Sequence, residues 1–332
     1  MSTTDRSPAG VPGPLGPLRM TPGRWVALAV GVPVAVALIG WAGFSLVSSL
    51  ARGSYPFSYQ VPVQDGQVAV NVNAGAVTLR EASGSGAAWL TGTVQYGLVR
   101  PGISEFTTPT GTSVGVNCGD VTNTNCDVNA TLDVPAKTGV TLWSNGGDVT
   151  ASGFSSGVTL LAAGGNVDAS DLSGDLRLDT GGGDLTGTGL TGAIQVTTEG
   201  GNVDASNLNS TGTMRFDTGG GDLNGNGLTG NLQLITEGGN VGTNGVVSQH
   251  VVVQSGGGDV TLAFAQIPQS LQITAEGGNV AVILPPGDTK YAVSTPDTSG
   301  GNVSYPSSLV NSNSPHKITI DSGGGDITIS QG

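Results

Sequence analysis

A near duplication in the middle of the chain limits the folds that are open to it. The segment 171–206, DLSGDLRLDTGGGDLTGTGLTGAIQVTTEGGNVDAS, is followed at once by a close copy over residues 207–244. A Gly-Gly pair followed by Asp or Asn, and then by Val, Leu or Ile, occurs ten times. The acid or amide of each motif is called here a corner residue, and the ten are Asp148, Asn166, Asp184, Asn202, Asp222, Asn240, Asp259, Asn279, Asn302 and Asp326. Self-similarity at a fixed short period indicates a solenoid.

Apolar residues recur in a fixed register after the corner residues. Leu176 and Leu178 lie 10 and 12 positions after one corner residue, and Ile194 and Val196 lie 10 and 12 positions after the next. Because Asp-type and Asn-type units share this template, the coil has about 18–20 residues and the duplication holds two coils. Apolar alternation predicts strands whose inward face is buried only when coils stack in a parallel ladder.

We therefore predict an all-β fold, a parallel β-solenoid (β-helix) of roughly ten regular coils. The general crossover preference favours a right-handed solenoid. The Gly-Gly pair is expected to supply the positive φ of a sharp corner.

The corner residues alternate between Asp and Asn through the first eight units. Carboxylates on adjacent coils would lie about 5 Å apart, close enough to repel each other. Asn side chains can also form hydrogen-bonded ladders between stacked strands. We interpret the alternation as a separation of like charges along one edge.

Composition narrows the possible partners. The chain of 332 residues has 57 Gly and a net charge of −13. The glycines follow no Gly-X-Y period, which excludes collagen. Only eight Lys and Arg lie from residue 52 onward, and they form no basic stripe. We expect no nucleic-acid partner.

The first 50 residues differ in character from the rest. Residues 1–24 are rich in Pro, Gly and Ser and predict a disordered cytoplasmic tail. Residues 25–50 contain no charge and are long enough to cross a bilayer as one transmembrane helix. The alternative is a cleaved signal peptide, whose apolar core is usually about 7–15 residues. Three Arg precede the span and Arg52 follows it, so the positive-inside rule predicts a cytoplasmic N-terminus and an extracytoplasmic C-terminal domain.

Three parts are expected beyond the span. Residues 51–60 predict a linker, residues 61–139 an irregular N-terminal cap with the first coils, and residues 140–332 the regular solenoid. The last coil ends at Gly332 with no cap. We expect an exposed edge there, at which a second subunit could pair.

Cys118 and Cys126 are the only cysteines. On the oxidising side of a membrane such a pair predicts a disulfide that staples the cap. Two free buried thiols are the alternative. A metal site would need further ligands, and no His lies nearby in the sequence.

Acidic residues that recur near one corner are candidates for a cation-binding edge: Asp179, Asp184, Glu199, Asp217, Asp222 and Glu237. Calcium prefers such oxygen ligands, although the motifs lack the nine-residue spacing of calcium-binding repeats. The other interpretation is a solvated acidic edge, and no other cofactor is expected.

Enzymatic activity is not expected. Arg177 and Arg215 occupy matching outward positions two coils apart, and nearby acids could supply paired carboxylates for a polysaccharide-acting enzyme. Each of these residues nevertheless fits an ordinary outward position of the repeat, and no insertion breaks the regular coils.

A resemblance to a known family rests on four sequence segments. They are the corners FDTGGGDL and ITEGGNV, the closing KITIDSGGGDITIS and the entry LDVPAKTGVTLWSNGGDV. Over about residues 65–332 the chain resembles a family of bacterial extracytoplasmic β-solenoid domains of unknown function, often labelled as adhesins. The resemblance implies a surface-exposed β-helix and no catalytic residues. We expect a membrane-anchored, non-catalytic binding module with a protein or glycan partner; the alternative is a passive stalk or envelope scaffold.

Overall fold

The computed structural model describes residues 30, 33–41, 53–72, 75–82, 86–97, 99–108, 111–116 and 126–332. The chain divides into two units, Met1–Leu50 and Ala51–Gly332. In the first unit residues 33–41 are helical. Across the described residues, no helix combines the length and the apolar character that crossing a bilayer requires. The predicted tail 1–24 and most of the predicted span 25–50 lie outside the described residues, so the transmembrane helix stays a prediction.

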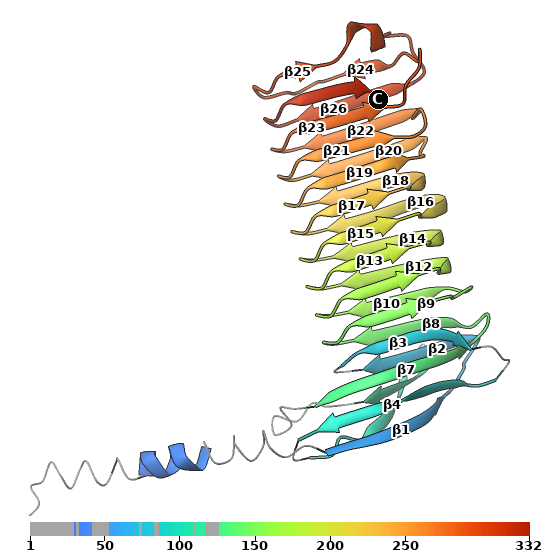
Figure 1. The fold of residues 1–332 in the computed structure, drawn as a ribbon, viewed down its shortest axis with the longest axis vertical. Helices are drawn as coiled ribbons and strands as arrows, with labels where there is room; N and C mark the ends of the chain where they lie inside the picture. Colours follow the sequence, from blue (N-terminus) through green and yellow to red (C-terminus); the bar gives the residue numbers. More distant parts are fainter. Residues whose placement is uncertain are drawn as a thin grey trace, which may run out of the picture. The chain divides into compact units, whose positions relative to one another are not determined.

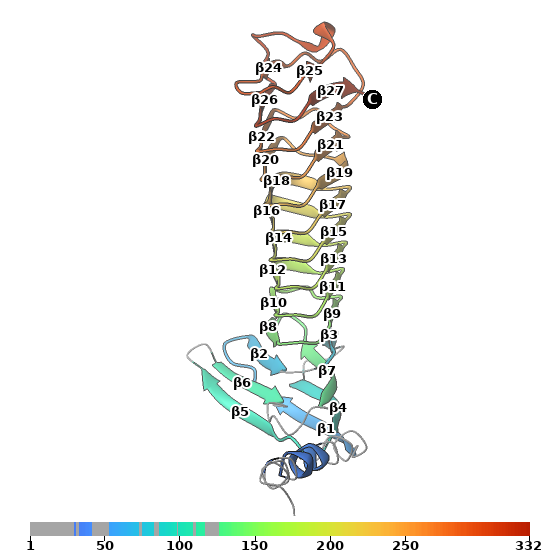
Figure 2. The same ribbon diagram turned by 90° about the vertical axis from the view of Figure 1, so that its left-hand side faces the viewer.

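The second unit is a solenoid built from two β-sheets (Figure 1, Figure 2). Each regular coil places one strand in sheet B and the next in sheet A, and neighbouring coils pair in parallel. Within the fully described stretch 126–332, nine such strand pairs stack, from β8 and β9 to β26 and β27. The predicted all-β parallel solenoid is confirmed, with nine regular coils where the sequence predicts about ten.

The strands of the regular coils have the following bounds. In sheet B they are β8 (Gly139–Ser144), β10 (Val158–Ala162), β12 (Ser173–Thr180), β14 (Thr191–Thr198), β16 (Asn209–Thr218), β18 (Thr229–Thr236), β20 (His250–Ser255), β22 (Ser270–Ala275) and β26 (Lys317–Ser322). In sheet A they are β9 (Val149–Ser152), β11 (Val167–Ser170), β13 (Leu185–Thr188), β15 (Val203–Ser206), β17 (Leu223–Asn226), β19 (Val241–Val246), β21 (Val260–Phe264), β23 (Val280–Leu284) and β27 (Ile327–Gln331).

The predicted apolar register forms the core between the two sheets. Leu176 and Leu178 of β12 are 3% and 0% exposed, and Val167 of β11 is 1% exposed. Leu172, in the turn between these strands, is fully buried. Burying each such side chain stabilises a protein by about 1.5–3 kcal/mol, and stacking repeats the contribution in every coil.

The corner glycines are needed for a reason other than the predicted one. At Gly183 and Gly201 the φ angle is not positive. A Cβ on Gly201 would lie 1.9 Å from the carbonyl oxygen of Gly183, the equivalent residue of the preceding coil. Positive φ occurs instead at the opposite turn of the coil, at Asp171 (52°), Gly189 (66°) and Asn207 (55°). The predicted positive φ is therefore wrong at these corners. Glycine is needed there because it permits the backbones of adjacent coils to stack closely.

The N-terminal part of the solenoid departs from the regular pattern. In sheet A, β4 (Ala88–Tyr96) pairs antiparallel with β1 (Gly53–Val61) and with β7 (Asp127–Pro135), and β3 (Val77–Ala82) continues in parallel to β9. In sheet B, β2 (Gln67–Val72) pairs in parallel with β8 and with β6 (Gly111–Val116), and β6 pairs antiparallel with β5 (Ile103–Thr108).

Residues 53–61 form strand β1, so the predicted linker over residues 51–60 is wrong there. Tyr55, Phe57 and Tyr59 alternate along β1 and pack against the core. An alternating row of aromatic side chains fits a half-buried strand, and pairing with β4 satisfies its backbone.

Residues 285–316, called here the C-terminal cap, cover the end of the stack. They contain β24 (Ala292–Ser294), β25 (Val303–Ser304) and the short 3₁₀ helix η1 (Ser307–Leu309). β26 pairs with β22 on one side and β24 on the other, and β27 lies between β23 and β25 (Figure 1). The final coil is therefore inserted between the preceding coil and the cap. The predicted bare edge at the last coil is wrong, because an earlier segment of the chain covers it.

Tyr291 anchors the C-terminal cap. Its side chain is 0% exposed, and its ring meets that of His316 edge-on, with the centroids 5.9 Å apart. Burial raises the pKa of the Tyr291 hydroxyl. The cap therefore has its own buried aromatic anchor, as a terminal repeat needs to cover the open end of a core.

Candidate functional site

The corner residues form one continuous hydrogen-bonded ladder. The backbone N–H of each corner residue except Asp148 donates to the side-chain Oδ1 of the corner residue on the neighbouring coil, as from Asp184 to Asn166 (2.9 Å) and from Asn202 to Asp184 (2.8 Å). The ladder runs in the spatial order Asp148, Asn166, Asp184, Asn202, Asp222, Asn240, Asp259, Asn279, Asp326 and Asn302. These side chains satisfy backbone donors that the corners leave open, which is a structural role.

The order of the ladder in space differs from its order in the sequence at one point. Asp326 lies between Asn279 and Asn302, because the final coil is inserted below the cap. The two amides that are consecutive in the sequence are thereby separated, and Asp and Asn alternate through all ten positions. Asn302 Nδ2 also donates to Asp326 Oδ1 (3.1 Å). This arrangement fits the interpretation that alternation separates like charges.

Replacing Asn202 by Asp is expected to lower the free energy of unfolding by about 1 kcal/mol at neutral pH. The new carboxylate keeps the Oδ1 acceptor but lies between Asp184 and Asp222 on the adjacent coils. Denaturant titration at low and high ionic strength measures the effect. The loss should shrink in high salt. A loss that is the same at low and high ionic strength contradicts the charge explanation.

Buried hydroxyl groups form hydrogen bonds with the backbone at the corners. The buried hydroxyls of Thr198 and Ser255 donate to the carbonyl oxygens of Gly201 (2.6 Å) and Gly258 (3.0 Å), the glycines that precede the corner residues. Ser144 and Ser322 make the same bond. The Ser or Thr that ends each of these strands thus satisfies a buried carbonyl.

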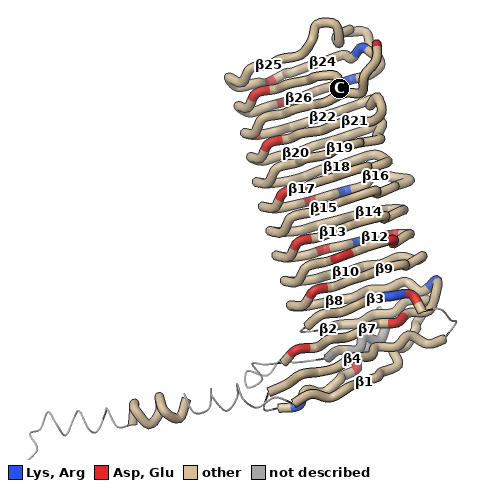
Figure 3. The backbone as a smooth tube through the Cα atoms, viewed as in Figure 1, with Lys and Arg blue, Asp and Glu red and all other residues tan. Residues whose placement is uncertain are grey.

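The acidic residues predicted as a cation-binding edge separate into different environments. Asp184 and Asp222 belong to the ladder. Asp179 and Asp217 each lie 2.6 Å from an arginine, Arg177 and Arg215 respectively. Within the described part of the chain, no three His, Cys, Asp or Glu side chains are arranged to hold a metal ion. Figure 3 shows acidic segments along the stack and few basic ones.

Glu199 and Glu237 are separated by the coil of Gly219. Gly220 N–H donates to Glu199 O (3.1 Å), and Glu237 N–H donates to Gly219 O (3.0 Å). Their backbones are thus two coils apart, about 10 Å at the usual strand spacing. Calcium binding at this edge stays a prediction.

The predicted disulfide falls partly outside the described residues. Cys126 is disulfide-bonded, whereas Cys118 lies outside the described residues. The pairing of Cys118 with Cys126 stays a prediction.

One outward row of side chains crosses four adjacent strands of sheet B. Trp143 of β8 is the register neighbour of Leu161 of β10, which neighbours Asp179 of β12, which neighbours Thr197 of β14. We call these four residues the Trp143 row. They follow one another at intervals of 18 residues. The row was not predicted from the sequence, although those equal intervals are the signal that locates it.

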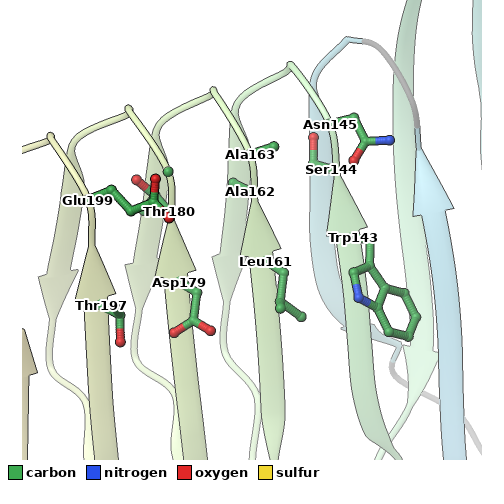
Figure 4. Close-up of a pocket in the computed structure, with 11 residues that line it drawn as sticks. Trp143, Ser144, Asn145, Leu161, Ala162, Ala163, Asp179, Thr180, Thr197 and Glu199 are labelled. Atoms are coloured by element: carbon green, nitrogen blue, oxygen red, sulfur yellow. The ribbon is translucent and has the colours of Figure 1, made fainter.

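A hollow of about 440 Å³ lies beside the Trp143 row (Figure 4). The residues next to the row, toward the corners, are Asn145, Ala163, Gly181 and Glu199. Space opens because Ala163 and Gly181 are small, whereas Glu199 closes one end. The volume lies within the range of about 300–1,000 Å³ that is usual for small-molecule sites. The hollow is therefore large enough for a ligand.

Asp179 lines this hollow and has one carboxylate oxygen that is buried. Its Oδ2 accepts bonds from Arg177 Nε (2.9 Å) and Nη2 (2.6 Å). Its Oδ1 is buried and has no hydrogen-bond partner among the described residues. A buried acceptor without a donor is unfavourable.

Comparison with known proteins places the chain in a family. The model of the Toastrack DUF4097 family matches residues 57–330. The chain belongs to this family. The predicted resemblance to a β-solenoid family of unknown function is thereby confirmed for the Toastrack chain.

Solved structures and curated proteins add the following findings. The Toastrack chain is similar to a putative adhesin from Bacteroides fragilis, with 13% identity and a TM-score of 0.35 over 84% of this chain and 97% of that one. It is also similar to a putative adhesin from Parabacteroides distasonis, with 10% identity and a TM-score of 0.37 over the same shares. No curated protein matches it.

Proposed function

We propose that this Toastrack protein is a membrane-anchored, non-catalytic interaction module exposed outside the cell membrane, which binds its partner on the outward face of sheet B. The observation that carries the proposal is the hollow beside the Trp143 row, where apolar and polar side chains meet on one face. Most of its lining residues belong to hydrogen-bonded strands, and such elements hold binding groups more accurately than loops do.

The charges on this face favour binding over catalysis. Arg177 and Arg215, the arginines that a polysaccharide-acting enzyme could have used, ion-pair with Asp179 and Asp217 of their own strands. The apolar segment 25–50 and the three arginines before it support the anchor and its orientation.

Epitope tags at the two ends of the full-length protein test the orientation. On intact cells we expect antibody to reach the C-terminal tag, and to reach the N-terminal tag only after permeabilisation. Release of the protein from the membrane fraction by carbonate contradicts the anchor. Labelling of the N-terminal tag on intact cells contradicts the orientation.

Proximity labelling on intact cells then tests the interaction. We expect a partner whose labelling is lost on Trp143→Ala and retained on Trp89→Ala. Trp89 is the matched control because it belongs to β4 of sheet A and is 41% exposed. A partner set that neither substitution changes contradicts binding at the hollow.

A rigid spacer is the second candidate, and the unbroken corner ladder favours it. Deleting residues 223–259 removes the coils of Asn240 and Asp259, joins Asp222 to Val260 and keeps the alternation of the ladder. The stack shortens by about 10 Å, while the hollow at residues 143–199 is retained. A binding module should keep its partner after this deletion, whereas a spacer of fixed length should lose its function.

A further inference from the structure

We infer that the hollow beside the Trp143 row binds a neutral oligosaccharide, an inference that rests on the proposed binding function and names its ligand class. The site combines the indole of Trp143, the apolar Leu161 and the oxygen atoms of Asp179, Thr197 and Glu199 in one open hollow. Along the row of register neighbours an indole occurs only at Trp143, whereas carboxylates recur in later coils at Asp217 and Glu237.

The apolar end of the hollow suits one face of a sugar ring. Trp143 and Leu161 are large apolar side chains that point outward from adjacent strands and remain partly exposed. A pyranose presents C–H groups on one face and hydroxyls around its rim. A flat aromatic surface can pack against that C–H face.

The other end of the hollow is rich in hydrogen-bond acceptors. The carboxylate of Asp179 lines the hollow, and Glu199 contributes an exposed carboxylate. Thr197 adds a hydroxyl that can donate or accept. Neutral sugars carry many hydroxyl donors, so acceptors of this kind match them.

The charge around the hollow and the length of the hollow favour a neutral, extended ligand. No Lys or Arg lines the hollow, and the chain carries a net charge of −13, so an anionic ligand would be repelled. Asp179 is already neutralised by Arg177, which weakens the site for a cation. The hollow crosses four strands from β8 to β14, about 14 Å, which suits an extended chain of sugar units more than a single ring.

A glycan array probed with the full-length protein in detergent micelles tests the inference. The array carries neutral, anionic and amino-containing oligosaccharides, and isothermal titration calorimetry measures the affinity for each hit. We expect neutral hits only. Trp143→Ala should lower the affinity by about tenfold or more, since one aromatic contact is worth roughly 1.4 kcal/mol.

A second variant separates binding from folding. Ala163 is exposed and lines the hollow, and the repeat places Glu199 and Glu237 at the same register position. A long side chain therefore fits there, and Ala163→Gln should fill the hollow in a folded protein. We expect it to lower the affinity about as much as Trp143→Ala does, while Trp89→Ala leaves it unchanged; circular dichroism confirms folding.

Any one of three results would overturn the inference. These are an array without a neutral hit, hits confined to anionic or amino sugars, and equal losses of affinity in Trp143→Ala and Trp89→Ala. If proximity labelling still finds a partner that depends on Trp143, the proposed function stands and only the ligand class fails. If that dependence is also absent, both fail.

Discussion

Replacing Gly201 by Ala is expected to lower the free energy of unfolding by about 3 kcal/mol. The added Cβ would lie 1.9 Å from the carbonyl oxygen of Gly183. Because that atom is backbone, no side-chain rotation relieves the contact, and the two coils must move apart. Their separation weakens the hydrogen bond from Asn202 to Asp184. Urea denaturation of the full-length protein, followed by circular dichroism, measures the loss.

The adjacent glycine is the control. A Cβ on Gly200 would meet nothing within 4 Å, and its φ is not positive. Gly200→Ala should therefore change the free energy of unfolding by less than about 0.5 kcal/mol. Similar losses for the two substitutions would show that intrinsic backbone preference, and not the stacking distance, requires these glycines.

Removing residues 317–332 is expected to release the whole C-terminal cap. Within the described structure, β24 pairs only with β26 and β25 only with β27. Ile318, Ile320, Ile327 and Ile329, all at most 2% exposed, would be lost from the core. We expect residues 285–316 to lose protection from hydrogen exchange and from proteolysis. The uncovered end of the stack should also promote self-association.

The internal deletion of residues 223–259 is the control for this truncation. It removes more residues but keeps both ends of the stack covered. In a solenoid, stability is a sum over neighbouring coils, so the internal deletion should leave the cap protected and the protein monodisperse. Protection of residues 285–316 in the truncated chain would contradict the assignment of the final coil as the platform of the cap.

The coil and its core could be predicted from the sequence because they are set by residues close together in the chain. Leu176 and Leu178 recur as Ile194 and Val196 at the same offset in the next coil, and stacking of the coils buries them. The role of the corner glycines could not be predicted in this way. Sequence does not distinguish a glycine needed for positive φ, as at Gly189, from one needed for close approach, as at Gly201.

Non-local pairing accounts for the other differences. Strand β1 was predicted as a linker because its partner β4 lies further along the chain, beyond two other strands. The inserted final coil has a signal in the sequence, since Asn279 and Asn302 break the alternation that Asp326 restores in space. The candidate site depends on neighbours 18 residues apart, and only the register of the strands shows that Trp143 lies beside Leu161.

Insertion of the final coil also fixes the order in which the molecule can be completed. Chains fold progressively during synthesis, and the cap residues are made before the coil on which they rest. They cannot reach their native position until residues 317–332 have followed them. A ribosome that stops early therefore leaves a protein without any terminal cover. Burial of Tyr291 therefore depends on residues 317–332, which are synthesised after it.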